Sequence, residues 1–144
     1  MRLSLGVRTT DGSTGTAAWE IRTGATPGRV KVVEFGLFLA AAAASTYGIG
    51  FPQAVGITPT SPVDFEEEDQ NNVLASGVVQ SALAWGTGPT VPTYFFRRIA
   101  LPATVGTGVI WTFPEGLVIP VSSSLVLWNA AENGVVDAYA VVDL

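Results

Sequence analysis

The sequence predicts an all-β protein with a single-domain, jelly-roll-like β-sandwich, and two observations lead to that prediction. Short apolar runs recur along the chain between clusters of Gly, Pro, Ser, Thr and Asn, which is typical of sandwiches and barrels. The length of 144 residues suits one domain. Its 16 Gly and 9 Pro are close to average usage, so neither a collagen nor a disordered tract is indicated.

Each apolar run is expected to form a strand, and turn residues separate several of them. In chain order the expected strands are Leu3–Val7, Ala17–Arg22, Val30–Leu39, Thr46–Gly50, Val73–Trp85, Tyr94–Ile99, Gly108–Phe113, Leu117–Ile119, Ser123–Ala130 and Val135–Val142. Asp11-Gly12-Ser13 and Glu132-Asn133-Gly134 predict hairpin turns, because Asn and Gly tolerate positive φ. Pro114-Glu115-Gly116 predicts another tight reversal between two apolar runs.

The segment Leu37–Ala44 carries two conflicting signals. Ala and Leu favour a helix, but the preceding Val30–Phe35 reads as a strand and no N-cap residue separates the two. We expect a strand whose small side chains let another backbone approach closely. A short helical turn is the alternative.

The domain organisation follows from the polar stretch Thr9–Thr16. We expect residues 1–15 to form an N-terminal arm, in which residues 1–8 add a strand to a neighbouring molecule. Residues 16–144 are then the β-sandwich domain.

The composition argues against catalysis. The chain has no His and no Cys, and its single Met is Met1. His and Cys supply the commonest catalytic groups and most soft metal ligands, so we expect no enzyme, no cofactor and no metal centre. Charged residues make up 13% of the chain against 48% hydrophobic residues, and the mean hydropathy is +0.41. Such a surface predicts a protein that is buried against other protein.

Nucleic acid and membrane are not expected partners. The net charge is −5, with 7 cations against 12 acidic residues, whereas binding to a phosphate backbone requires clustered cations. The uncharged segment Phe35–Val63 is interrupted by Gly and Pro, and its most apolar part, Phe35–Ala44, is too short to span a bilayer.

The acidic residues suggest two kinds of chemistry, and both have simpler explanations. A calcium ion is one candidate for binding by the carboxylates of Asp64, Glu66, Glu67, Glu68 and Asp69. The spacing of these residues does not match an EF-hand, so a solvated loop is favoured. A glycosidase would need two carboxyl groups in one cleft. The scattered Glu20, Glu34, Glu115 and Asp137 do not favour such a pair, and strand alternation predicts that Glu20 and Glu34 lie on a polar face.

Most aromatic side chains are expected in the core or at a subunit interface. Within Tyr94–Arg98, a strand would place Phe95 with Arg97 on one face and Phe96 with Arg98 on the other. Arginines beside aromatic residues, with no acidic neighbours in sequence, are typical of interfaces, and an edge strand protected by its charges is an equal alternative. The expected interface residues are Phe95, Phe96, Arg97, Arg98, Trp111, Phe113, Trp128 and Tyr139.

Several longer segments suggest a family. Trp19–Arg22, Val55–Val63, Ala82–Pro92, Phe95–Arg98 and above all Leu101–Asn129 resemble small uncharacterised β-rich proteins of actinobacterial tailed phages and prophages. The resemblance covers almost the whole chain but carries no activity or site residue with it. The pattern of the final strands is also similar to the closing strands of jelly-roll trimers.

The resemblance implies a structural virion protein, assembled in the host cytoplasm. We expect a decoration, or cement, protein that forms a homo-oligomer, most simply a trimer, and binds the phage major capsid protein through apolar and strand-edge contacts. The alternative is a tail module that binds a receptor or carbohydrate on the same sandwich. That module would show a concave cluster of exposed Trp or Tyr with Asn and Asp nearby.

Overall fold

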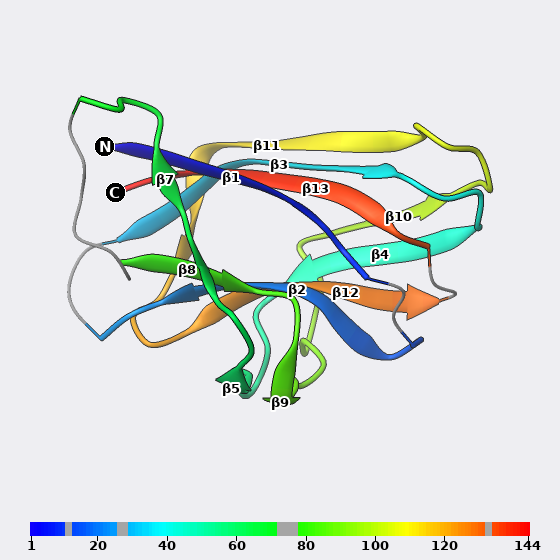
Figure 1. The fold of residues 1–144 in the computed structure, drawn as a ribbon, viewed down its shortest axis with the longest axis horizontal. Helices are drawn as coiled ribbons and strands as arrows, with labels where there is room; N and C mark the ends of the chain where they lie inside the picture. The colour runs from blue at the N-terminus through cyan, green and yellow to red at the C-terminus, as the bar shows by residue number, and fades with distance from the viewer. Residues whose placement is uncertain (11–12, 26–28, 72–77, 132–133) are drawn as a thin grey trace.

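Two antiparallel β-sheets packed face to face make up most of the molecule in a computed structural model (Figure 1). The structure describes residues 1–10, 13–25, 29–71, 78–131 and 134–144. These residues contain strands and connections but no helix. The prediction of an all-β sandwich is therefore confirmed.

The sheets contain five and six strands, and a small two-stranded sheet accompanies them. Sheet A has the order β11 (Gly108–Ile119), β3 (Val30–Leu39), β13 (Val136–Asp143), β1 (Arg2–Arg8) and β7 (Glu66–Glu67). Sheet B has the order β10 (Arg97–Leu101), β4 (Ser45–Gly50), β12 (Ser124–Ala131), β2 (Thr16–Thr23), β8 (Val79–Ala82) and β6 (Val63–Asp64). The small sheet pairs β5 (Ile57–Pro59) with β9 (Trp85–Thr87).

The long strands pair in a nested order. β1 pairs with β13, β2 with β12, β3 with β11 and β4 with β10, all antiparallel. Strands β1 to β4 fall alternately in sheets A and B, so the chain crosses the sandwich at each connection. Each strand from the first part of the chain thus lies against one from the last part, and the core forms only when both parts are in place.

Most expected strands are found within a residue or two of their bounds, and β11 is the main correction. Residues 108–113 and 117–119 do not reverse at Pro114-Glu115-Gly116, because both halves pair with β3 in the same direction. The register shifts between Thr112 and Leu117, which makes this segment an irregularity within one strand. Pro114 is tolerated because β11 is an edge strand and no ladder partner needs its missing N–H.

Two further expectations are corrected near the first strands. Residues 2–8 do not extend as an arm but form β1, and each of them pairs with a residue of β13 in the same chain. The alanine run is neither a continued strand nor a helix: β3 ends at Leu39, and residues 40–44 form an irregular connection to β4. At the start of this connection, the peptide N–H of Ala40 donates to the Val135 carbonyl at 2.8 Å.

Three expectations fall on residues that the structure does not describe. The turn at Asp11-Gly12-Ser13 includes residues 11–12, the turn at Glu132-Asn133-Gly134 includes residues 132–133, and the start of the strand Val73–Trp85 includes residues 73–77. The remainder of that last segment forms β8 and β9 rather than one strand.

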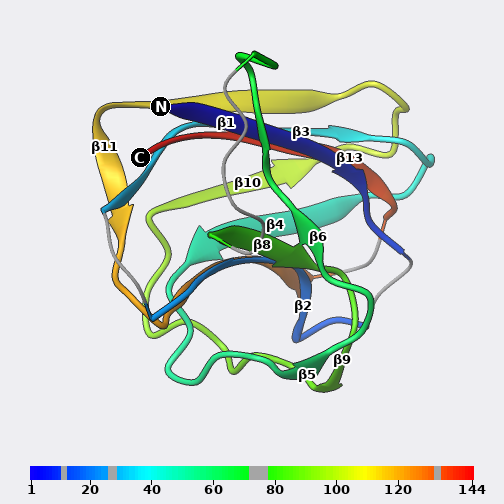
Figure 2. The same ribbon diagram turned by 60° about the vertical axis from the view of Figure 1, so that its left-hand side comes forward.

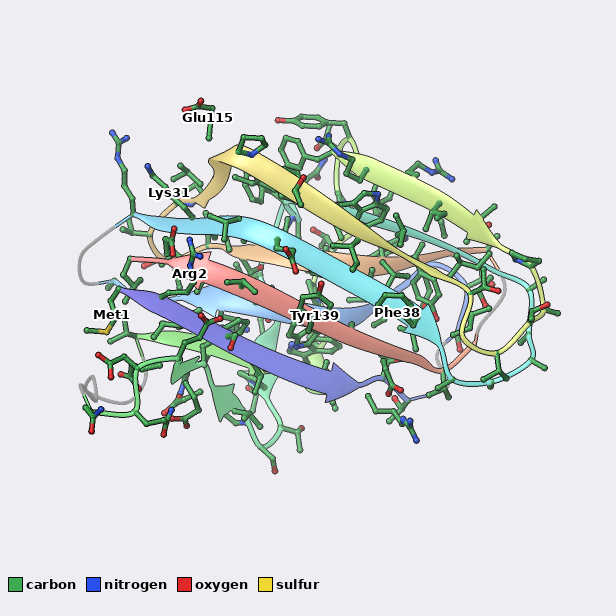
Figure 3. The ribbon with its side chains drawn as sticks, turned by 90° about the horizontal axis from the view of Figure 1, so that it is seen from above. Met1, Arg2, Lys31, Phe38, Glu115 and Tyr139 are labelled. Carbon is green, nitrogen blue, oxygen red and sulfur yellow. The ribbon has the colours of Figure 1, made fainter. Side chains whose placement is uncertain are left out.

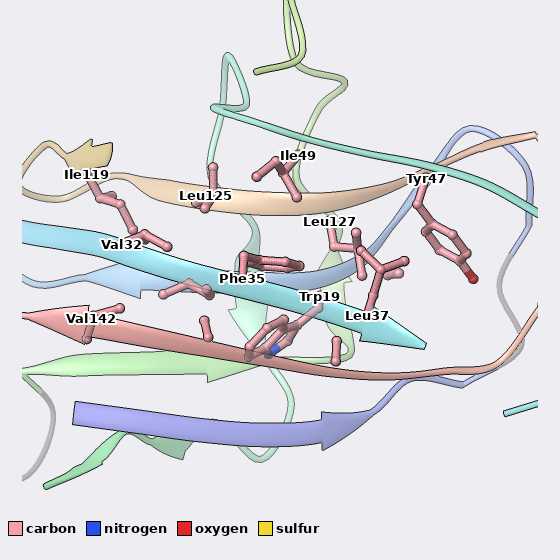
Figure 4. Packing of buried hydrophobic residues seen from close by; sticks show 14 of the residues in the cluster. Trp19, Val32, Phe35, Leu37, Tyr47, Ile49, Ile119, Leu125, Leu127 and Val142 are labelled. Atoms are coloured by element: carbon pink, nitrogen blue, oxygen red, sulfur yellow. The ribbon is translucent and has the colours of Figure 1, made fainter. Parts of the chain in front are cut away.

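The core joins the two sheets through aromatic rings (Figure 4). Trp19 of β2 in sheet B lies 5.6 Å from the Phe35 ring of β3 in sheet A, centroid to centroid. Phe65 stacks on Trp19 at 6.1 Å with an interplanar angle of 8°. Because Phe65 lies between β6 of sheet B and β7 of sheet A, this stacking holds the chain where it crosses from one sheet to the other.

The acidic segment, Asp64–Asp69, is not the solvated loop that was expected, because it contributes to two edge strands, β6 and β7.

We expect Phe65→Ala to destabilise the protein by about 3–5 kcal/mol, because a buried ring that packs on Trp19 is replaced by a cavity. Urea unfolding followed by tryptophan fluorescence measures the free energy of unfolding. The matched control is Val63→Ala two residues earlier, whose side chain is exposed and whose effect should stay within about 0.5 kcal/mol. Equal effects of the two variants would contradict the role given to Phe65.

Candidate interaction surface

A layer of irregular chain covers the face of sheet B that points away from sheet A (Figure 2). We call its two segments, residues 51–59 and 85–96, the cover. They hold each other through the β5–β9 pair, a bridge between Pro52 and Pro92, and reciprocal bonds of Ala54 and Thr90. The Ala54 N–H donates to Thr90 Oγ1 at 2.8 Å, and the Thr90 N–H donates to the Ala54 carbonyl at 3.0 Å.

Glu20 fastens the cover to the sandwich. It was expected on a polar face, but the cover buries it completely, at 0% exposure. Its Oε1 accepts hydrogen bonds from Arg22 Nη1 at 2.6 Å and Trp85 Nε1 at 3.0 Å. Its Oε2 accepts from the Gly56 N–H at 2.9 Å and from Ser124 Oγ at 2.8 Å. Gly56 and Trp85 belong to the two segments of the cover, so one carboxylate binds both of them to β2 and β12.

This arrangement is a structural clamp, because both carboxylate oxygens of Glu20 are fully used. Arg22 balances the charge, and its Nη1 also donates to the Gly56 carbonyl at 2.7 Å. A buried carboxylate requires such partners, since an unpaired one is very costly. Four donors on two oxygens leave no lone pair directed at a substrate, so Glu20 is not arranged as a general base.

Missing side chains in β4 let the cover approach closely. A Cβ added to Gly48 would lie 2.6 Å from the Phe95 ring, so the ring occupies the place that any larger residue needs. At Gly50 an added Cβ would lie 2.5 Å from the Tyr94 carbonyl oxygen. The two glycines therefore set how deeply Tyr94 and Phe95 lie against sheet B.

The cover ends in an aromatic cluster that reaches solvent. Phe96 packs edge-on against Phe51 at 5.0 Å and against Tyr94 at 5.3 Å between ring centroids. Tyr94 is 62% exposed, while Phe51 and Phe96 are half-buried. Large exposed aromatic residues on a fixed support are common at the centre of protein interfaces. We call Phe51, Tyr94 and Phe96 the aromatic cluster.

Two arginines follow the aromatic cluster at the start of β10. The Arg97 guanidinium lies over the Phe113 ring at 4.9 Å, and that of Arg98 lies over the Phe95 ring at 5.2 Å. Arg98 and Phe95 therefore lie together, contrary to the alternation expected from the sequence, because β10 begins only at Arg97. Within the described ranges, ion pairs closer than 4.0 Å involve Arg2, Arg8 and Arg22 but neither of these two.

The structure gathers five of the eight expected interface residues at this corner and separates the other three. Phe95, Phe96, Arg97, Arg98 and Phe113 surround the start of β10. Trp111 packs at 6.2 Å against core residue Phe35, and Trp128 is buried. Tyr139 lies on the open face of sheet A (Figure 3). Phe51 and Tyr94 were not among the expected interface residues. No local sequence signal indicates that Tyr94 is exposed.

The open face of sheet A is crossed by polar pairs. Arg2 and Asp143, and Arg8 and Asp137, face each other across β1 and β13 with two hydrogen bonds each. Tyr139 donates its hydroxyl proton to Glu34 Oε1 at 2.5 Å, and its ring lies over Gly36. Burial, aided by the hydrogen bond to Glu34, raises the pKa of Tyr139 to about 12. Such pairs stabilise neighbouring strands of one sheet.

The remaining acidic residues do not gather into a metal site in the described part of the chain. No group of three acidic side chains is placed to hold a metal ion there. In the acidic segment, Asp64 accepts from Gln80 at 2.8 Å, and Asp69 accepts from the Asn71 N–H at 3.0 Å. The search for a membrane-spanning helix also found none among the described residues.

Replacing Glu20 by Gln should loosen the cover and destabilise the protein by roughly 3 kcal/mol, because Arg22 is left unpaired and one carboxylate acceptor becomes a donor. Urea unfolding gives the loss, and hydrogen exchange at the Gly56 amide shows whether it is local. Glu115→Gln is the matched control, since that side chain is exposed. Unchanged exchange at Gly56 in E20Q would contradict the clamp.

Tyr139 should make stability depend on alkaline pH. Its pKa of about 12 in the folded state lies above the ordinary tyrosine pKa of 10.0, so the folded state keeps a proton that the unfolded state releases. Stability is then fully present below pH 10 and falls as the pH rises toward 12. Ultraviolet titration of the phenolate should show a late component that moves to lower pH in Glu34→Gln and disappears in Tyr139→Phe. A titration that is identical in E34Q would refute the pairing.

Comparison with known proteins adds no assignment to this geometry. No protein-family model matches the chain, and the comparisons with curated proteins and with solved structures found no match. The resemblance to small phage proteins is not supported by them and stays a prediction. Function has to be argued from the clamp, the aromatic cluster and the strand edges themselves.

Proposed function

We propose that this protein is a structural component of a phage particle, a decoration protein that binds the capsid through the aromatic cluster. The observation that carries the proposal is Tyr94, which is 62% exposed, packs edge-on against Phe96 and has its carbonyl close to Gly50 of sheet B. Protein interfaces are enriched in Tyr and Arg and use them as anchors.

The strand order supports a jelly roll as the finer fold class. In a jelly roll, a long antiparallel ribbon is wrapped so that early strands lie against late ones in two sheets, an architecture that occurs in viral capsid and lectin domains. The pairs β1–β13, β2–β12, β3–β11 and β4–β10 follow such an order. Fold alone does not fix function, so the proposal depends on the exposed residues of the surface.

The clamp explains why the proposed surface is rigid. Glu20 holds both segments of the cover, and Gly48 lets Phe95 lie close to the sheet. A preorganised surface loses less conformational entropy when it binds. Long-lived attachment to a particle is favoured by such rigidity.

A sugar-binding tail module is less well supported. Stacking on sugars needs exposed aromatic faces, yet none of the four Trp is exposed: Trp19 and Trp128 are buried, and Trp85 and Trp111 are half-buried. Tyr94 is the one exposed residue among the Trp and Tyr side chains, all of which are described. No observation favours the module over decoration.

The proposal is tested on purified particles of a phage that encodes the chain. We expect quantitative mass spectrometry to find the protein in the head fraction in many copies. Tyr94→Ser should lower its occupancy about ten-fold or more, in the range of an interface hot spot. Val121→Ser is the matched control, because Val121 is also exposed, at 54%, but lies on the β11–β12 connection.

Three outcomes would overturn this assignment. They are absence of the protein from particles, location in the tail only, and equal occupancy of Y94S and the wild type. Specific binding to host-surface glycans, abolished by Y94S, would replace decoration by the tail-module function.

A further inference from the structure

The β10 edge and the β6–β7 edge of the sandwich carry opposite charge. Sheet B begins with β10 and ends with β6, and sheet A begins with β11 and ends with β7. Figure 3, seen from above sheet A, places β10 beyond β11 on one side and the green segment of β7 past β1 on the other. Arg97 and Arg98 lie on the β10 side, whereas Asp64, Glu66, Glu68 and Asp69 lie along the β6–β7 side.

The β10 edge is a cationic surface with a fixed geometry. Arg97 and Arg98 are exposed, and their guanidinium groups rest on the rings of Phe113 and Phe95. A stacked guanidinium keeps its N–H edge free to bind a carboxylate with two hydrogen bonds. β10 pairs only with β4 in the described structure, so its other edge is also open to a strand.

The β6–β7 edge supplies the complement. Glu66 and Glu68 are exposed, and the described cations form no ion pair with either of them within 4.0 Å. Arg2, which borders the same hollow as Glu68, donates its two side-chain bonds to Asp143. An apolar residue accompanies the acidic ones: Val63 of β6 is 51% exposed. This edge therefore offers carboxylates to the arginines of the β10 edge, together with an apolar contact.

We infer that copies of this chain associate head to tail, with the β10 edge of one copy against the β6–β7 edge of the next. Each edge repels its own kind, because like charges face each other in a symmetric pairing. A heterologous contact of this kind closes into a ring when its rotation closes, and a trimer is the simplest such ring. The inference goes beyond the proposed function, because it concerns how copies of the chain contact one another and does not require that they bind a capsid.

Charge reversal tests the inference in the purified wild-type chain and its variants. Sedimentation velocity at micromolar concentration should show an oligomer that dissociates toward about 1 M salt, where the Debye length is roughly 3 Å. Arg97→Glu with Arg98→Glu should raise the dissociation constant at least ten-fold, and Glu66→Lys with Glu68→Lys should do the same. The variant that combines all four changes should associate again, because both edges have exchanged sign.

The control has the same change in charge at two cations that form no ion pair within 4.0 Å in the described chain. Arg29→Glu with Lys31→Glu should leave the oligomer intact, and circular dichroism should show that every variant is folded. Each of three results would overturn the inference. They are a wild-type chain that is monomeric at all concentrations, association of R97E/R98E equal to that of the wild type, and no association of the variant that combines all four changes. A monomer that still occupies phage heads would overturn head-to-tail assembly alone, whereas an oligomer absent from particles would overturn the decoration function alone.

Discussion

The alternation of side chains along β2 places Trp19 and Glu20 on opposite faces of sheet B, and both layers of the molecule are attached there. On one face, Trp19 contacts Phe35 of the opposite sheet and Phe65 of the crossing segment. On the other face, Glu20 binds both segments of the cover through Gly56 and Trp85. Successive residues of a strand point to opposite faces of the sheet. One strand can therefore contribute to an apolar core and to a polar clamp at adjacent residues.

The clamp is stable only as a complete set of bonds. A carboxylate without water needs a counter-ion and donors for its lone pairs, and Arg22, Trp85, Gly56 and Ser124 supply them. Since these donors come from β2, β12 and both parts of the cover, Glu20 couples segments that are far apart in sequence. The cover is thus held at Gly56 and Trp85 by a buried charge, whereas the chain next to Tyr94 is held by the Phe96 N–H, which donates to the Ile49 carbonyl at 2.9 Å.

Pairing of charges also decides which surfaces are free. Arg2, Arg8 and Arg22 bind acidic partners in the same chain, two of them across the open face of sheet A. Arg97 and Arg98 rest on aromatic rings instead, at an edge that has one neighbouring strand. Arg29 and Lys31 also form no ion pair in the described chain, but the guanidinium groups of Arg97 and Arg98 lie over rings, and the acidic residues of the β6–β7 side give them a complement.

The fold class and most strand positions could be predicted from the sequence, because apolar runs and turn residues act locally. The Pro114–Gly116 segment was misread as a reversal because a bulge and a turn use the same residues, and only pairing with β3 separates them. Strand alternation correctly separated Glu20 from its neighbours but wrongly implied exposure, since the face it occupies is covered by residues 51–59 and 85–96. Three properties could be learned only from the folded chain, because they depend on contacts between distant segments. They are the burial of Glu20 as a clamp, the exposure of Tyr94, and the position of Arg97 and Arg98 opposite the acidic edge.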